Sequence, residues 1–271
     1  MLKLSFPNNF IETNSLIPED IWNALTLAPL VIIRGHKETI TREWTFEFVH
    51  KLGRFRNDDL QIGLGQRKRK VNLSKFNVFA LDNADKDYLH NGPYIQNWHN
   101  DNLCYEDPPR FSIITCERVD GNPHPYTQFR NYAALYKYSS YTEEAKDIMF
   151  THFKTDANLS HFQDTVVKLT EEWEHPLVQE FCGIKHYSFN PGYISYQTKE
   201  KHDLLNRIEN EAKNPMFEYK HVYQTGDILI WNQLMTNHRV INKKGDKRRI
   251  CWRASFDDNL VKEYYEQKDR N

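Results

Sequence analysis

The sequence predicts a mainly β protein with flanking helices, built on a double-stranded β-helix, or jelly-roll, core. From residue 76 onward, short apolar or alternating stretches rich in β-branched and aromatic residues recur, which is typical of strands. Many strands with few helices between them favour two facing sheets, because that arrangement closes most exposed strand edges. The chain of 271 residues shows no repeat and no linker, so we expect one domain over residues 1–271.

Helix and strand patterns alternate at the start of the chain. Ser15 or Pro18 can open a helix, residues 30–33 (LVII) form an apolar run, and a second helical pattern covers residues 44–52. The later strand candidates are residues 76–81, 111–119, 186–190, 193–197, 217–223, 227–231 and 249–256.

Two further segments between these strands have helical apolar spacing. Residues 139–153 and 198–214 both carry acidic residues in the first turn of the expected helix, where a negative charge is favourable. Thr198 is a suitable N-cap for the second segment. We therefore predict a helix in each.

Charge and cysteine content predict a cytoplasmic protein and argue against binding to nucleic acid or to a membrane surface. Thirty-six basic and thirty-seven acidic residues give a formal charge of -1, which provides no overall field for nucleic acid or a membrane. No signal-peptide pattern and no run of eighteen apolar residues occur. Four widely spaced cysteines are typical of reduced thiols. The basic run at residues 67–70 is interpreted as a solvated loop or a charged strand edge, with an anion clamp as the alternative. Homo-oligomerisation stays open.

Two side chains in the segment QNWHNDNLCYEDPP, residues 96–109, are candidate metal ligands. His99 and Asp101 are two positions apart, so on a strand their side chains point to the same face. Because His-x-Asp pairs are common by chance, an ordinary surface pair is the alternative reading. His238, 139 residues after His99, follows an apolar strand and can supply the third ligand.

The last predicted strand directs two arginines to one side. Alternation places Arg249, Cys251 and Arg253 on one face of that strand and Ile250 and Trp252 on the other. A buried guanidinium carries a penalty of several kcal/mol unless it meets an anion. The two arginines therefore predict carboxylate partners inside the fold.

The ordered motifs of the chain resemble the taurine dioxygenase (TauD/TfdA-like) family of iron(II)- and 2-oxoglutarate-dependent oxygenases. Residues 27–36 and 47–55 are similar to the amino-terminal part of that family, and residues 183–196 are similar to a middle strand. The motifs that carry the resemblance are Trp98-His99-x-Asp101, Thr127 in YTQF, GDILIW at residues 226–231, His238, Arg249 and Arg253.

The resemblance implies that His99, Asp101 and His238 bind ferrous iron as a facial triad. Such a triad leaves three positions open, enough for the bidentate cosubstrate 2-oxoglutarate and for dioxygen. Zinc accepts the same ligands, but a hydrolytic zinc site would not explain two inward arginines. The family pattern assigns the distal carboxylate of 2-oxoglutarate to Arg249 and to the hydroxyl of Thr127.

Two segments depart from the family pattern. The loop GNPHPYTQF replaces a glycine pair and an acidic residue that usually precede the threonine, and we interpret His124 in it as a loop histidine. Asn232 and Gln233 replace the usual Asp-Asn after Trp231, which changes the polarity around the site without removing a ligand.

The substrate is expected to be a small organic anion with an apolar body. Arg253 is the candidate for its charged group, with 2-oxoglutarate as the alternative partner of this arginine. The aromatic residues expected near the mouth of the site, with a core position as the alternative for each, are Tyr94, Trp98, Tyr105, Phe189 and Tyr193. The resemblance implies hydroxylation by default, with desaturation or ring formation as other outcomes. Asp101 argues against halogenation, because halogen-transferring relatives carry a small residue there. The alternative function is a jelly-roll metal- or ligand-binding protein without oxygenase activity.

Overall fold

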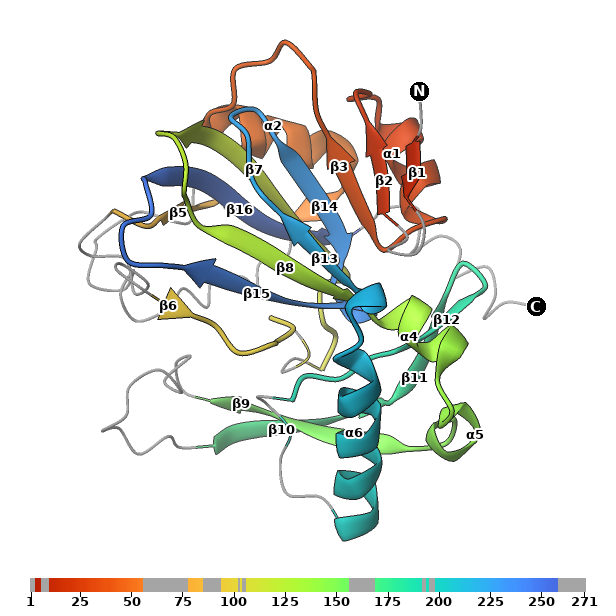
Figure 1. Cartoon of the computed structure of the whole chain (residues 1–271). Helices are drawn as coiled ribbons and strands as arrows, with labels where there is room; N and C mark the ends of the chain where they lie inside the picture. Colours follow the sequence, from red (N-terminus) through yellow and green to blue (C-terminus); the bar gives the residue numbers. More distant parts are fainter. Residues whose placement is uncertain are drawn as a thin grey trace.

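The computed structural model describes residues 3–5, 10–55, 78–84, 94–101, 103, 106–155, 169–191, 194 and 198–257. Two sheets face each other in the upper part of the molecule, and a group of helices and short hairpins lies below them (Figure 1). None of the described helices is long and apolar enough to span a membrane.

The larger sheet has eight described strands in the order β1-β2-β3-β14-β7-β16-β4, with β5 also paired to β16. Most neighbours are antiparallel, and only β2 and β3 pair in parallel. The strands are β1 (Lys3–Ser5), β2 (Phe10–Thr13), β3 (Leu30–Ile33), β4 (Arg54–Phe55), β5 (Phe79–Asp82), β7 (Phe111–Val119), β14 (Ile228–Asn232) and β16 (Arg249–Asp257).

The smaller sheet has four described strands in the order β13-β8-β15-β6. They are β6 (Tyr94–Ile95), β8 (Tyr126–Asn131), β13 (Glu218–His221) and β15 (Thr236–Asn242), and a 3-10 helix, η5 (Gln233–Met235), connects β14 to β15. The chain thus passes repeatedly from one sheet to the other, which gives the predicted jelly-roll core.

Successive side chains of the central strands enter two different apolar clusters. Ile228 and Ile230 of β14 pack against helices α1 (Pro18–Leu25) and α2 (Arg42–Leu52) on the outer side of the larger sheet. Leu229 and Trp231 pack between the two sheets, together with Phe129 of β8. Both faces are therefore buried, which explains why β3 and β14 read as unbroken apolar runs. Burying each such side chain contributes about 1.5–3 kcal/mol.

A third apolar cluster lies beneath the sheets. It contains residues of the helices α4 (Tyr132–Tyr138), α5 (Thr142–Ala145) and α6 (Lys199–Ala212), the 3-10 helix η4 (Pro215–Phe217), and the strands β9 (Met149–Thr155), β11 (Val178–Phe181) and β12 (Ile184–Tyr187). Strand β10 (Leu169–Pro176) pairs with β9. Helix α6 begins as predicted, because the hydroxyl of Thr198 accepts a hydrogen bond from the backbone N–H of Lys201.

The helix predicted for residues 139–153 is largely wrong. Only Thr142–Ala145 are helical, and residues 149–155 form strand β9, which pairs with β10. The acidic start does form one helical turn, but the β-prone residues after it find a partner strand that the local pattern does not reveal. Pairing between distant segments overrides local spacing here.

We expect the free energy of unfolding to fall between pH 8 and pH 5, with His152 of β9 as one cause. Burial lowers the pKa of His152 to about 3, with a further contribution from His175. In the unfolded state the pKa of a histidine is near 6.5, so between pH 6.5 and pH 3 the unfolded state binds a proton at His152 that the folded state does not bind. The stability is present above pH 6.5 and is lost as the pH falls towards 3, by about 2 kcal/mol at pH 5 for this one group.

Urea unfolding at pH 8 and pH 5 measures this loss. His152→Phe should reduce the difference between the two pH values by about 2 kcal/mol, whereas His202→Gln, which changes an exposed histidine of α6, should not. The same pH dependence in His152→Phe and in the parent protein would contradict the assignment.

Candidate metal centre and anion site

The loop that carries His99 is held directly to strand β15. His99 and His238 form an isolated antiparallel bridge, in which each backbone N–H donates to the other residue's carbonyl oxygen, with N···O distances of 3.0 and 2.8 Å. Residues opposite each other in such a bridge place their side chains on the same face. Two backbone hydrogen bonds therefore bring together histidines that are 139 residues apart in the sequence.

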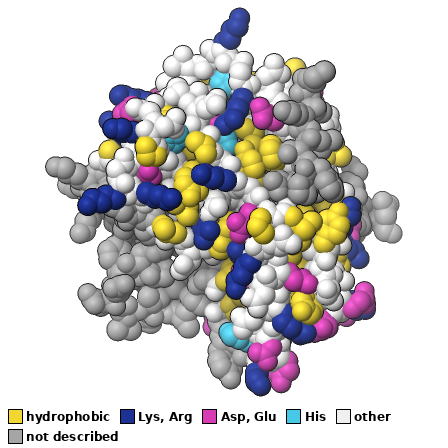
Figure 2. Space-filling model, viewed as in Figure 1, with side chains coloured by type: hydrophobic (Ala, Val, Ile, Leu, Met, Phe, Trp, Pro, Cys, Tyr) yellow, Lys and Arg dark blue, Asp and Glu magenta, His cyan; other side chains and the backbone are white. Residues whose placement is uncertain are grey.

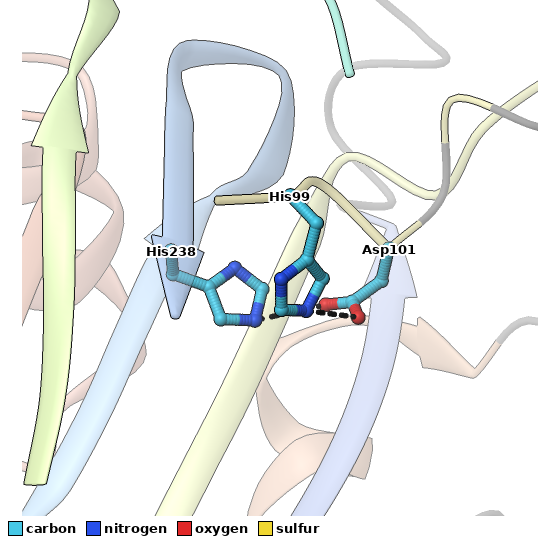
Figure 3. A group of neighbouring side chains, drawn as sticks. All are labelled: His99, Asp101 and His238. Atoms are coloured by element: carbon cyan, nitrogen blue, oxygen red, sulfur yellow. Dashed lines mark ion pairs between the residues drawn. The ribbon is translucent and has the colours of Figure 1, made fainter. Parts of the chain in front are cut away.

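The three predicted ligands converge on one point. His99, Asp101 and His238 each offer a ligand atom within 4.8 Å of the other two. Nε2 of His99 lies 3.4 Å from Oδ1 of Asp101, and Nε2 of His238 lies 3.2 Å from Oδ2 (Figure 3). Nδ1 of His99 is 2.8 Å from the carbonyl oxygen of Asn97, which can only accept, so Nδ1 donates there and Nε2 is the ring nitrogen directed at Asp101.

Asp101 is also held by a guanidinium. Nη2 of Arg253 donates to Oδ2 of Asp101 and to Oγ of Ser112, 3.4 Å away. Burial alone would raise the pKa of Asp101, but Arg253 and the two imidazoles hold that pKa well below its ordinary value. Burial lowers the pKa of His238 to about 4. A carboxylate and a neutral imidazole are the forms that bind metal ions.

The donor set fits a single divalent transition-metal ion. Two imidazole nitrogens and one carboxylate oxygen are the ligands of a facial triad. Donors bound to one ion at about 2.1 Å each lie at most about 4.2 Å apart. The observed limit of 4.8 Å therefore requires only small side-chain movements on binding.

A second polar group lies around Arg249 on the interior side of β16. Arg249 is buried, its Nη1 donates to the carbonyl oxygen of Pro125 at 3.1 Å, and its guanidinium carbon lies 4.4 Å from the ring centroid of Tyr223. The hydroxyl of Tyr223 is 2.9 Å from that of Thr127, which is also buried. The two residues predicted to bind the cosubstrate, Arg249 and Thr127, are thus joined through Tyr223.

The sequence analysis did not assign a role to Tyr223. A signal was present, since Tyr219, His221 and Tyr223 alternate along one predicted strand and so share a face. Nothing in that pattern tells which face is directed at Arg249. Only the pairing of His221 with Thr127 across β13 and β8 places this row of side chains inside the fold.

A largely buried ion network of Asp227, Arg34 and His221 contacts Tyr223 and so supports the region around Arg249. Asp227 accepts hydrogen bonds from Nε and Nη2 of Arg34, both at 2.8 Å, and from Nε2 of His221 at 2.9 Å. Burial would raise the pKa of Asp227, but the bonds from His221 and Arg34 lower it. The ring of His221 meets that of Tyr223 edge to face, with centroids 4.6 Å apart.

The aromatic residues predicted to line the substrate site lie elsewhere or outside the described residues. The guanidinium carbons of Arg130 and Arg239 lie 4.1 and 4.4 Å from the ring centroid of Trp98. Arg130 follows Phe129 and Arg239 follows His238 in the sequence. The two arginines therefore point to the face of the smaller sheet opposite to that of Phe129 and His238. Phe189 is 1% exposed and stacks on Tyr132 in the cluster beneath the sheets. These two positions favour a packing role.

Other sequence predictions concern the surroundings of the site. The side chain of Tyr94, the residues Tyr105 and Tyr193, and the basic run 67–70 lie outside the described residues. His124 is buried, and its Nδ1 lies 2.9 Å from the carbonyl oxygen of Gly121. Figure 2 shows one face of the molecule, on which basic side chains lie among acidic and hydrophobic ones.

Gln233 extends the polar contacts of Arg253. Its Nε2 lies 3.5 Å from Oγ of Ser255, which is 3.0 Å from Oγ of Ser112, and Ser112 in turn accepts from Arg253. The departure from the family pattern at Gln233 is therefore linked to Asp101 only through Ser255, Ser112 and Arg253.

The fold and the site together define a jelly-roll protein with a two-histidine, one-carboxylate group of the kind that binds ferrous iron. The family model of taurine catabolism dioxygenases, the TauD, TfdA family, matches residues 7–255, and the chain belongs to this family. Enzymes of this family are non-haem iron dioxygenases that use iron(II), 2-oxoglutarate and dioxygen, and this chain is one of them.

Individual relatives agree with the family assignment. Pentalenolactone F synthase of Streptomyces arenae is 24% identical over 269 residues, which cover 89% of this chain and 87% of that protein. The structure of AAD-2 in complex with Mn(II) and N-oxalylglycine is similar with a TM-score of 0.73, 18% identity and coverage of 96% and 98% of the two chains. A taurine dioxygenase from Burkholderia xenovorans gives a TM-score of 0.70 at 17% identity, with 96% and 91% covered. These structures support the fold.

We expect the purified protein to bind about one ferrous ion and to lose most of it in His99→Ala or His238→Ala. Each change removes one of three donors, and metal affinity depends on the full set. Elemental analysis after anaerobic loading measures the iron content. His202→Ala, on the exposed side of α6, is the matched control and should keep its iron. Full iron occupancy in both triad variants would refute the site.

Proposed function

We propose that this chain oxidises a C–H bond of a small organic anion, with ferrous iron held by His99, Asp101 and His238. The observation that carries the proposal is the convergence of these three side chains, within 4.8 Å of one another, in a chain of the TauD/TfdA family. Iron held by these residues would supply the oxidising chemistry with 2-oxoglutarate and dioxygen, and succinate and carbon dioxide would be the products formed from the oxoacid.

Arg249 and Thr127 bind the distal carboxylate of 2-oxoglutarate in this proposal. The buried guanidinium of Arg249 supports it, since a planar fork of N–H donors matches a carboxylate and is strongest away from water. The link through Tyr223 supports a shared role for the two residues. The protein's contribution is to hold the oxoacid in one orientation before dioxygen binds.

Arg253 has two roles in this proposal. Its hydrogen bond to Asp101 keeps the carboxylate charged and fixes its rotation. A guanidinium has five N–H donors, so the same side chain can also receive an anionic group of the primary substrate. This would place the substrate next to the carboxylate ligand, within reach of the metal.

The substrate class proposed is a small organic anion with an apolar body, such as an amino acid, a sulfonate or a carboxylic acid. Hydroxylation is the default reaction, and desaturation or ring formation are the other outcomes. Asp101 supports oxygenation over halogenation because it retains the carboxylate ligand. The names of the similar proteins, a taurine dioxygenase and pentalenolactone F synthase, differ too widely to select one substrate.

We further propose that residues 1–271 act as one dioxygenase domain, in the cytoplasm, on small molecules and not on nucleic acids. The family match over residues 7–255 and the formal charge of -1 support this.

A screen of candidate acids for substrate-stimulated succinate formation tests the function. We expect one class of acid to raise succinate formation well above the slow turnover without substrate, and Asp101→Ala to abolish that increase. The alternative function, a jelly-roll protein that binds metal or ligand without oxygenation, predicts binding of 2-oxoglutarate with no succinate for any acid.

We expect Arg249→Gln to weaken 2-oxoglutarate binding by about 2–4 kcal/mol, or about thirtyfold to a thousandfold, through loss of a charge-assisted and desolvated contact. Anaerobic titration of the metal-to-ligand charge-transfer absorption measures the dissociation constant. Arg239→Gln is the control, because Arg239 stacks on Trp98 on the other face of the smaller sheet. Unchanged affinity in Arg249→Gln would remove Arg249 from the cosubstrate site.

We expect Arg253→Gln, measured at saturating iron, to bind 2-oxoglutarate within about threefold of the parent protein while substrate-triggered succinate formation falls at least tenfold. Iron affinity should also fall, since Asp101 loses its charged partner. Ser112→Ala removes the neutral partner of Arg253 and should have a much smaller effect on both. A loss of 2-oxoglutarate affinity as large as that of Arg249→Gln would assign Arg253 to the cosubstrate.

A further inference from the structure

Tyr223 contacts both residues proposed to bind the distal carboxylate of 2-oxoglutarate. It is 2% exposed and lies between the two sheets. The guanidinium carbon of Arg249 lies 4.4 Å from the centroid of its ring, and its hydroxyl oxygen lies 2.9 Å from Oγ1 of Thr127. One rigid side chain thus sets the separation between a buried cation and a buried hydroxyl.

The two hydroxyl groups have one O–H more than their mutual hydrogen bond uses. Thr127 and Tyr223 each carry one hydroxyl proton, and either oxygen can be the donor of the bond between them. If Tyr223 donates, the hydroxyl proton of Thr127 remains available to an acceptor, and if Thr127 donates, that of Tyr223 remains available. In both cases the pair presents one O–H donor beside the guanidinium of Arg249, which favours an anionic acceptor.

The phenol remains a donor throughout the neutral range. Burial raises the pKa of Tyr223, and the opposing effect of Arg249 does not cancel the increase. The face of the phenol ring meanwhile attracts the guanidinium electrostatically and orients its plane. Tyr223 therefore fixes the position of the positive charge and also supplies or relays a hydroxyl proton.

The position of Tyr223 is itself fixed from behind. The edge-to-face contact with His221 is supported by the hydrogen bond from His221 to Asp227, and Asp227 is bound by Arg34 of the adjoining strand end. All of these side chains except Arg34 are almost fully buried. Such a supported ring has little freedom to move away from Thr127.

We propose that Tyr223 is the positioning residue that sets which oxoacid this enzyme accepts, by holding Arg249 and Thr127 at the separation that fits the distal carboxylate of 2-oxoglutarate. The inference rests on the proposed role of Arg249 and Thr127 in cosubstrate binding. It adds a third residue, which acts through the other two, and it assigns to that residue the discrimination against oxoacids without a distal carboxylate.

The test compares Tyr223→Phe with the parent protein for two oxoacids. Isothermal titration under anaerobic conditions, in the iron-loaded protein, gives dissociation constants for 2-oxoglutarate and for pyruvate, which lacks the distal carboxylate. Removing one hydroxyl from the buried pair should weaken 2-oxoglutarate binding about tenfold and leave pyruvate binding unchanged. The ratio of the two affinities should therefore fall about tenfold.

Tyr187→Phe is the matched control. It also removes the hydroxyl of a buried tyrosine, one that donates to Oγ of Ser139 at 2.9 Å, and Tyr187 lies in the cluster beneath the sheets. This variant should keep the parental affinity ratio. A thermal melt of each variant reports any general loss of structure, which would lower the affinity for both oxoacids together.

Thr127→Val provides a second, independent variant. If Tyr223 acts through Thr127, the double variant Thr127→Val/Tyr223→Phe should bind 2-oxoglutarate about as weakly as Thr127→Val alone, whereas independent effects would multiply. The inference is overturned if Tyr223→Phe keeps the parental affinity for 2-oxoglutarate, or if it weakens both oxoacids equally.

The same titrations distinguish a failure of the role of Tyr223 from a failure of the proposed cosubstrate site. If Arg249→Gln weakens 2-oxoglutarate binding and Tyr223→Phe does not, only the role of Tyr223 fails. If Arg249→Gln has no effect, the proposed cosubstrate site itself fails, and the role of Tyr223 fails with it.

Discussion

Two guanidiniums on the interior face of strand β16 set the electrostatic constraint on which the site depends. The alternation of the strand directs Arg249, Cys251 and Arg253 inward and leaves Trp252, Ala254 and Phe256 to pack against the helices. Charges placed there need anions, because the interior screens them poorly. Asp101 meets Arg253, which ties the metal-ligand loop to the larger sheet. Arg249 contacts a carbonyl oxygen and an aromatic face, and its planar guanidinium has the shape that the proposed binding of a distal carboxylate requires.

The metal ligands depend on a different kind of restraint, which comes from the backbone. His99 and His238 belong to segments 139 residues apart, and their bridge fixes both Cα positions before any ion binds. The hydrogen bond from His99 to Asn97 then selects the tautomer, and Arg253 selects the rotation of Asp101. The candidate ligands are thus positioned by contacts within the protein itself, so that little ordering remains to oppose metal binding. A register shift of one residue in β15 would turn His238 away from Asp101, which makes the pairing of β15 with β8 part of the site.

The fold could be predicted from the sequence where burial repeats at short range, and the site could be predicted only in part. The runs LVII and DILIW indicate central strands, because both faces of these strands are buried. Pro18, Thr198 and the apolar spacing of residues 44–52 indicate helices. Residues 149–155 were misread because their strand character depends on a partner, β10, that no local pattern shows. Trp98 directly precedes His99 in the sequence, yet its ring packs against Arg130 and Arg239, and Phe189, in a segment that resembles the family, packs on Tyr132 in the cluster beneath the sheets. The role of Tyr223 depends on which strands pair, and a single sequence does not reveal that.

The two halves of the site therefore respond to change in different ways. Around the metal, each contact is a hydrogen bond or an ion pair between groups that are already present, so the loss of one partner leaves a buried charge uncompensated. Around Arg249, the contacts hold a charge in position for a ligand, so a change there alters affinity and selectivity more than it alters the fold. β16 carries one arginine in each half, four residues apart, which fixes the distance between the carboxylate ligand and the proposed cosubstrate anchor. Because that distance is set by a central strand paired on both sides, the proposed selectivity for oxoacid length would depend on the sheet, while the substrate side can diverge in the loops around it.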